Sequence, residues 1–158
     1  MYKNGAYNKK HCLIIAIIIA TCLGYKYVSD KPNKYVDIND LVNKAYTSSK
    51  YDSEMAKHMS KDVYKDTNGY IMCELYYYQC KKPIKISFKS TEINQHKING
   101  KIFVYMVYDF KMFDADGKLV TGALNSSVVF TVTGTNDNLY IENKQEYMSG
   151  SEVPKMYK

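Results

Sequence analysis

The chain has 158 residues and a net charge of +6, and every basic residue is a lysine. It therefore lacks the forked guanidinium that reads guanine edges and clamps phosphates. Without residues 1–21, 19 lysines face 16 acidic residues, a net charge of +3. That balance is typical of an ordinary solvated surface, and we expect no nucleic-acid partner. The length suits one domain behind a short N-terminal segment.

Residues 1–24 are predicted to be a signal peptide or membrane anchor. Lys3, Lys9 and Lys10 precede a mostly apolar run over residues 12–24. A basic stretch followed by about 7–15 apolar residues is the layout of an export signal. Lysines retained in the cytoplasm would leave the following domain on the extracytoplasmic side of the cell membrane.

The fate of this segment stays open at the level of sequence. Ile19-Ala20-Thr21-Cys22 resembles a bacterial lipobox, which implies lipid attachment at Cys22 and a lipoprotein. Alternatively, residues 12–24 stay uncleaved as an anchor, lengthened by Tyr25–Tyr27 toward the roughly 20 residues that a spanning helix needs. Free secretion after cleavage and burial of the segment inside the fold are the remaining interpretations.

Residues 25–36 are polar and read as a tether, and two helices are predicted after it. From Asp37, an N-cap candidate, apolar residues recur at helical spacing. They are Ile38, Leu41, Val42, Ala45 and Tyr46. A second helix is predicted from Ser53, with Met55, Met59 and Val63 on one side, and residues 65–69 end it in a turn.

The chain after Gly69 is predicted to form strands, with a helix as the less favoured alternative for residues 70–79. The expected strands cover residues 70–79, 84–89, 101–113, 119–133 and 139–147, and a bulge or bend is expected between Gly122 and Ser127. Residues 101–113 carry apolar side chains on both faces, which predicts cover on both sides. Leu139, Ile141 and Tyr147 are expected on one face, and residues 149–158 as a loose tail. The fold class is therefore α+β, with N-terminal helices packed on a curved antiparallel sheet over residues 37–148.

Cys73 and Cys80 are the two cysteines outside the membrane-directing segment. In a strand or in a helix their spacing puts them beyond the roughly 7 Å between Cα atoms that a disulfide allows. A tight reversal within residues 74–79 would permit a bridge, but that stretch lacks Gly, Pro, Asn and Asp. Both regular geometries thus argue against a bridge, and the question stays open.

Five residues are candidates for lining a pocket: Glu74, Tyr76, Tyr78, Tyr105 and Asp109. Tyrosines offer binding area and a hydroxyl, although ordinary packing in a tyrosine-rich chain explains the run at 76–78 as well. Asp109 lies in the most apolar strand, where burial would suit acid–base work, or it marks the exit of that strand into solvent. No cofactor or metal is expected, because His58 and His96 have no further ligand at a suitable spacing.

Residues 37–147 resemble the cystatin-like cone of the nuclear-transport-factor-like superfamily, most closely in the last hairpin, Gly134-Thr-Asn-Asp-Asn-Leu-Tyr-Ile141. Behind a membrane anchor, this resemblance implies a small Gram-positive lipoprotein or a membrane-tethered subunit of conjugation or type IV secretion. The membrane-directing segment, the strand with two apolar faces and the lack of any acid–base cluster in the sequence favour a non-catalytic module that binds a protein or cell-wall partner or forms a homodimer. The alternative is a small cone-fold enzyme that uses Asp109 and nearby tyrosines. Fold likeness alone does not carry a function.

Mass spectrometry of the native N-terminus separates these interpretations. A lipoprotein would begin at a diacylated Cys22, whereas an uncleaved anchor would retain Met1 and residues 12–24. The prediction is one of these two forms, recovered in the membrane fraction. An intact chain found in the cytosol would contradict the predicted export.

Overall fold

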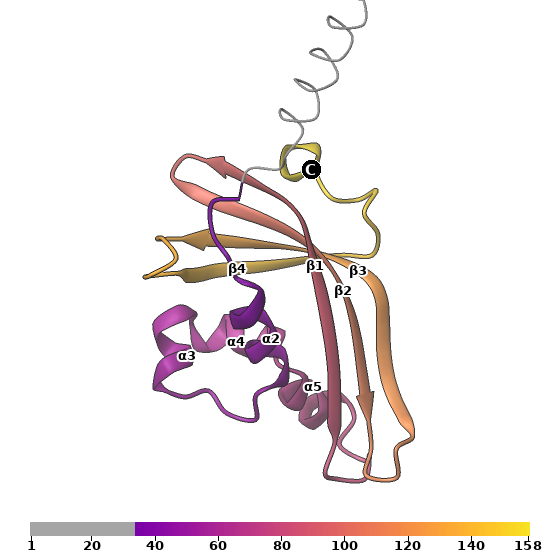
Figure 1. Ribbon diagram of the computed structural model, residues 1–158. Coiled ribbons are helices and arrows are strands. Elements are labelled where there is room, and N and C mark those ends of the chain that lie inside the picture. The colour runs from indigo at the N-terminus through magenta and orange to yellow at the C-terminus, as the bar shows by residue number, and fades with distance from the viewer. Residues whose placement is uncertain (1–33) are drawn as a thin grey trace, which may run out of the picture. The chain divides into compact units, whose positions relative to one another are not determined.

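Four helices precede four strands in the computed structural model, which describes residues 34–158 (Figure 1). The helices are α2 (Asn39–Thr47), α3 (Ser53–His58), α4 (Lys61–Thr67) and α5 (Gly69–Tyr76). The strands are β1 (Lys85–Ile98), β2 (Lys101–Phe113), β3 (Leu119–Thr133) and β4 (Tyr140–Tyr147), and a 3-10 turn, η1 (Lys155–Tyr157), ends the chain. The segment predicted for residues 1–24, Cys22 included, and most of the tether lie outside the described residues. No helix within residues 34–158 is long and apolar enough to cross a membrane.

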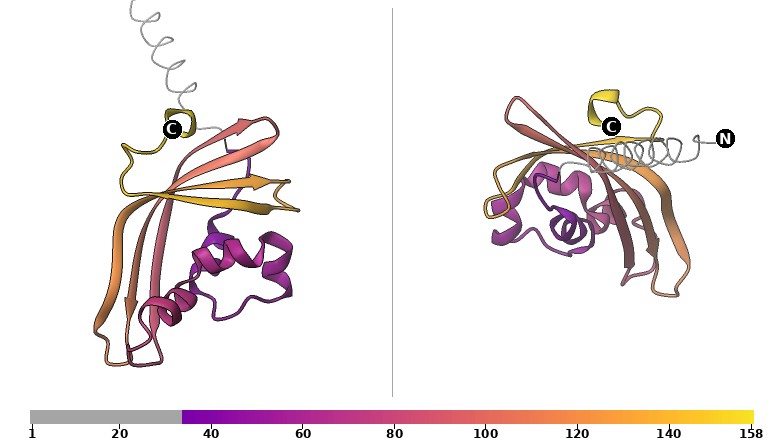
Figure 2. Two further views of the ribbon diagram at one scale, coloured as in Figure 1. Left: turned by 180° about the vertical axis from the view of Figure 1, so that it is seen from behind. Right: turned by 45° about the horizontal axis from the view of Figure 1, so that its top comes forward.

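The strands form one curved antiparallel sheet in the order β1-β2-β3-β4, so the predicted α+β class is confirmed. All four helices cover one face of this sheet (Figure 2). The main core lies between them, where α2 contributes Val42, Ala45 and Tyr46. The predicted apolar stripe of the first helix therefore does face the sheet, and the Tyr46 ring stacks on Phe88 of β1 with ring centroids 4.0 Å apart.

The predicted second helix is divided into α3 and α4. Asp52 caps α3 by accepting from the Met55 N–H at 2.8 Å, and Ser60 caps α4 by accepting from the Val63 N–H at 3.2 Å. Between the two helices, Met59 is extended and makes a parallel bridge to Ile141 of β4. This extended residue is incompatible with one continuous helix.

The strand predicted for residues 70–79 is wrong, because this stretch begins with the helix α5. Asn68 Oδ1 accepts from the N–H groups of Tyr70 and Ile71 at 3.0 and 3.1 Å, which caps the helix. Gly69 is needed for close packing: a Cβ there would lie 2.7 Å from Ile86 Cδ1 and 2.9 Å from Phe110 Cε2. The cap and this close approach outweigh the strand preference of the aromatic residues that follow.

The two faces of β2 are covered by different parts of the chain. One face carries Val104, Met106 and their even-numbered neighbours into the core under the helices. The other face carries Tyr105, which packs with Val129 and Val153 in a second cluster. Val153 is only 2% exposed, and Tyr157 stacks on Phe103 with ring centroids 4.7 Å apart. The C-terminal segment predicted to be a loose tail is thus packed on the outer face.

A bulge in the β3–β4 ladder corrects the predicted face of Tyr147. Val132 pairs with Ile141 and Thr131 pairs with Asn143, so Glu142 is the extra residue. The bulge reverses the alternation after Ile141. Ile141 stays in the main core, whereas Tyr147 packs with the outer cluster.

Two adjacent residues of β1 hold the two ends of the described chain. Gln95 is buried, and its Oε1 accepts from the N–H groups of Tyr35 and Val36 at 2.8 and 3.1 Å. Its Nε2 donates to the Val36 carbonyl at 2.6 Å. On the outer face, His96 Nε2 lies 2.7 Å from the carbonyl oxygen of Lys158. The start of the domain and its last residue are therefore fixed to opposite faces of one strand.

Asn68→Ala is expected to lower the free energy of unfolding by about 2–4 kcal/mol, because it removes the α5 cap and the side-chain donor of the buried Ala45 carbonyl, whereas the Ser48 carbonyl keeps the Tyr64 hydroxyl. Asn68 Nδ2 donates to the carbonyls of Ala45 and Ser48 at 2.8 and 2.7 Å. The measurement is chemical unfolding of the full chain in mild detergent. Asn43→Ala, an exposed position on α2, is the control and should change stability by less than about 0.5 kcal/mol. Equal losses in the two variants would contradict the role of Asn68.

Candidate functional site

The five predicted pocket residues do not form one site. Tyr105 and Asp109 lie on the outer face of β2, because Tyr108 and Phe110 on either side of Asp109 both belong to the core under the helices. Glu74 and Tyr76 belong to α5, and Tyr78 follows in the turn after it. The predicted pocket residues are thus divided between the outer face of the sheet and the helical layer on its other face.

Asp109 supports a bulge in β3. Tyr108 pairs with Ser126 and Phe110 with Ala123, so two residues of β3, 124 and 125, stand opposite Asp109. Asn125 has a φ of +53°, and its N–H donates to Asp109 Oδ1 at 2.9 Å. The bend expected between Gly122 and Ser127 is therefore confirmed as a bulge, and the carboxylate binds the N–H that the bulge leaves unpaired.

A run of tyrosines forms an exposed turn at the end of α5, residues 76–78, called here the aromatic turn. Tyr76 and Tyr78 are 73% and 70% exposed, and Leu75 beside them is 64% exposed. Tyr77 points the other way, and its hydroxyl donates to Thr121 Oγ1 of β3 at 3.1 Å. This hydrogen bond places the aromatic turn beside the beginning of β3.

The beginning of β3 has an unpaired edge. β4 pairs with β3 only from Ser127 onward, and no strand of the described chain pairs with that side of residues 119–126. Leu119 and Leu124 are 53% and 63% exposed there. We call residues 119–126 the free β3 edge. Its backbone groups on that side are available for pairing, and Val120 of this edge lines one hollow together with Tyr76, Tyr77 and Tyr78 of the aromatic turn.

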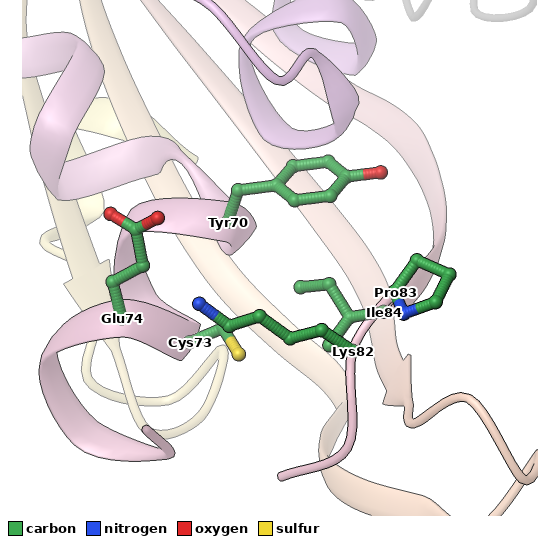
Figure 3. Close-up of a pocket in the computed structure, with 6 residues that line it drawn as sticks. All are labelled: Tyr70, Cys73, Glu74, Lys82, Pro83 and Ile84. Carbon is green, nitrogen blue, oxygen red and sulfur yellow. The ribbon is translucent and has the colours of Figure 1, made fainter. Parts of the chain in front are cut away.

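A small pocket of about 290 Å³ lies on the other side of α5 (Figure 3). Figure 3 shows Tyr70 and Glu74 projecting from α5, with Pro83 and Ile84 opposite and Lys82 extended between them. Cys73 forms part of its wall. Glu74 is therefore the one predicted residue that lines this pocket.

A group of polar residues on the helix-covered face is absent from the sequence prediction. Glu146 Oε1 accepts from the hydroxyls of Tyr108 and Tyr46 at 2.7 and 3.3 Å, and it lies 2.7 Å from Lys144 Nζ. Lys144 Nζ also donates to the Asp66 carbonyl at 2.7 Å. Lys144 and Glu146 line a hollow of about 440 Å³ beside α4 and α5. Their spacing of two along β4 was a sequence signal for a shared face, but the tyrosines come from α2 and β2.

The charges in this group are fixed rather than poised for proton transfer. Burial alone would raise the pKa of Glu146, but the charge of Lys144 and the hydrogen bonds from Lys144, Tyr108 and Tyr46 lower it. Burial and the neighbouring carboxylate raise the pKa values of Tyr108 and Tyr46. Near neutral pH the group therefore holds an ionised carboxylate and two protonated phenols. A general acid or base works best with a pKa near the working pH.

The two histidines of the domain both contact backbone carbonyl groups. His58 Nδ1 lies 2.9 Å from the Leu139 carbonyl, and His96 contacts Lys158 as described above. Within residues 34–158, no group of three or more His, Cys, Asp or Glu side chains could hold a metal ion.

Comparisons with protein-family models, with curated proteins and with solved structures return no match for the chain.

Glu146→Gln is expected to destabilise the fold in a pH-dependent way. The pKa of Glu146 is lower in the folded chain than its ordinary value of 4.5. Ionised Glu146 therefore stabilises the fold at pH values above 4.5, and this contribution is lost as the pH falls through the pKa of the folded chain. The stability difference between wild type and variant should thus shrink from about pH 7 to about pH 3. Thermal unfolding at several pH values measures it, with Glu142→Gln on the same strand as control. A difference that does not vary with pH would contradict this assignment.

Proposed function

We propose that the chain is a membrane-anchored extracytoplasmic binding module, which docks an extended segment of a partner protein onto the free β3 edge beside the aromatic turn. The single observation that carries this proposal is the unpaired, uncharged and exposed edge of residues 119–126. An added strand would pair with the edge through its backbone, and its side chains would contact the tyrosines.

The free β3 edge differs in composition from the other edges of the sheet. Proteins usually guard edge strands with charged residues, with proline or with a covering segment. β1 carries Lys85, Lys89 and Lys97, and β4 carries charges and is bridged by Met59. Residues 119–126, Leu-Val-Thr-Gly-Ala-Leu-Asn-Ser, contain neither a charge nor a proline. An edge left open in this way favours a partner strand.

The aromatic turn supports the same surface. Tyr76 and Tyr78 project at high exposure, whereas Tyr77 is held to β3 by its hydrogen bond to Thr121. Tyrosine is a typical anchor at protein interfaces, since it buries a large area at low entropic cost.

The extracytoplasmic location and the anchor are proposed from the sequence, with lipid on Cys22 or retention of residues 12–24 as the two forms of attachment. Helices followed by a curved four-stranded meander are also compatible with the cystatin-like cone, which we retain as a proposed relationship. The module would then resemble the tethered assembly subunits named above.

Catalysis by Asp109 has less support. Its carboxylate lies on the outer face and accepts the Asn125 N–H, away from the hollow that Lys144 and Glu146 line. Tyr105, the nearest candidate on that face, is packed with Val129 and Val153. The two residues are thus occupied by roles in the sheet itself.

A photo-crosslinking residue placed at Leu124 in the full chain, in its native membrane, is expected to trap one discrete product heavier than the chain by a different protein. The same residue at Ile93, an exposed apolar position on β1, is the matched control and should give none. Adding Leu119→Lys to the Leu124 probe should reduce the product at least about fivefold, because a charge on the edge opposes strand pairing.

Two outcomes would contradict the proposed partner. A product with the mass of two copies would show that the edge pairs with itself. Equal labelling from Leu124 and Ile93, or none from either, would show that the free β3 edge is not a docking surface.

A further inference from the structure

The sulfur atoms of Cys73 and Cys80 lie 3.1 Å apart. Two consecutive hydrogen bonds turn the chain back to bring them together: the Tyr77 N–H donates to the Cys73 carbonyl at 2.9 Å, and the Cys80 N–H donates to the Tyr77 carbonyl at 3.0 Å. One regular element from residue 73 to residue 80 would keep the two sulfur atoms apart. The helix ends at Tyr76 instead, and the reversal follows without Gly, Pro, Asn or Asp.

We propose that Cys73 and Cys80 are a disulfide-forming pair, which closes the aromatic turn covalently. A disulfide is about 2.05 Å long, so the two sulfurs need to approach by only about 1 Å. The bond would join the fully buried Cys73 of α5 to the half-buried Cys80 at the far side of the turn. Tyr76 and Tyr78 lie inside the closed loop.

The reaction needs a disulfide-bearing oxidant, and its atoms and electrons balance by thiol–disulfide exchange. Burial raises the pKa of Cys73 to about 11, so the more exposed Cys80 meets the oxidant first. The Cys80 thiolate attacks one sulfur of the oxidant and releases the other as a thiol. Cys73 then loses its proton to solvent, attacks Cys80 Sγ and displaces the second thiol. The two cysteines lose two protons and two electrons, and the oxidant disulfide becomes two thiols.

A metal role for this pair has no support, because no third His, Cys, Asp or Glu joins the two thiols within the described residues. A bridge has a clear physical consequence instead. It removes conformational freedom from the residues between the two cysteines in the unfolded chain, and in the folded chain it fixes the turn that carries the exposed tyrosines. The presence of the bond in the cell depends on the proposed extracytoplasmic location, whereas its formation by the purified chain does not.

The test oxidises the purified full chain with glutathione disulfide and maps its thiols. Cleavage after lysine and glutamate cuts at Lys65, Glu74 and Lys81, which separates residues 66–74 from residues 75–81. We expect these two peptides to stay joined until a reductant is added, in protein that runs as a monomer on a non-reducing gel. Two separate peptides, each carrying a free or glutathione-blocked cysteine, would overturn the proposal.

Thermal unfolding provides the second measurement. Reduction should lower the melting temperature of oxidised wild type by about 5 °C, because the loop constraint is lost. The melting temperature of the Cys80→Ser variant should not fall on reduction, because this variant cannot form the bridge. The melting temperature of the Cys22→Ser control should fall as that of wild type does. An identical response in wild type and Cys80→Ser would overturn the proposal. The crosslinking at Leu124 is independent of this test. If the disulfide forms but Leu124 labels no partner, only the proposed docking function is refuted. If Leu124 labels a partner but Cys73 and Cys80 do not form a disulfide, only the disulfide proposal is refuted.

Discussion

One buried side-chain amide, that of Asn68, determines how the helical layer is assembled. Its oxygen begins α5, and its nitrogen donates to the end of α2 through the carbonyls of Ala45 and Ser48. The same nitrogen lies 2.9 Å from the hydroxyl of Tyr64 on α4. Three helices thus converge on one residue that is 1% exposed. Because an unsatisfied buried amide is costly, the three helices must keep these positions together.

The orientation of α5 follows from this amide and from the glycine after it. Gly69 lets the first turn of α5 approach Ile86 and Phe110 of the sheet. Once that end is fixed, the helix runs along the sheet until Tyr77 reaches Thr121, and the aromatic turn comes to lie beside the free β3 edge. A capping interaction in the core therefore positions an exposed surface several residues away.

Much of the sheet could be predicted from sequence, because alternation of apolar residues is a local signal. The strands over 101–113 and 119–133 and the order of the meander are of this kind. The helix α5 was missed because its signal, Asn68-Gly69, is shared by turns and helix caps, and aromatic residues follow it. The face of Tyr147 was missed because one extra residue, Glu142, reverses the alternation. No pattern over a few residues contains that information.

The polar group at Glu146 shows why sites are harder to predict than strands. Tyr46, Tyr108 and Glu146 come from α2, β2 and β4, and the first and last are 100 positions apart in sequence. Only the folded sheet brings them together. Conversely, Glu74 and Tyr76 are close in sequence but line different hollows, since a helix distributes neighbouring side chains around its axis.

The contacts of Gln95 and His96 with the two ends of the described chain have a mechanical consequence. If the chain is tethered through its N-terminus, any tension enters the domain at Tyr35 and Val36, which Gln95 holds on one side of β1. The load then divides between β1, through these hydrogen bonds, and the backbone that continues into α2 at Asn39. His96 retains the opposite terminus on the reverse side of the same strand. The Gln95 hydrogen bonds therefore resist a pull from the N-terminal side before that pull reaches α2.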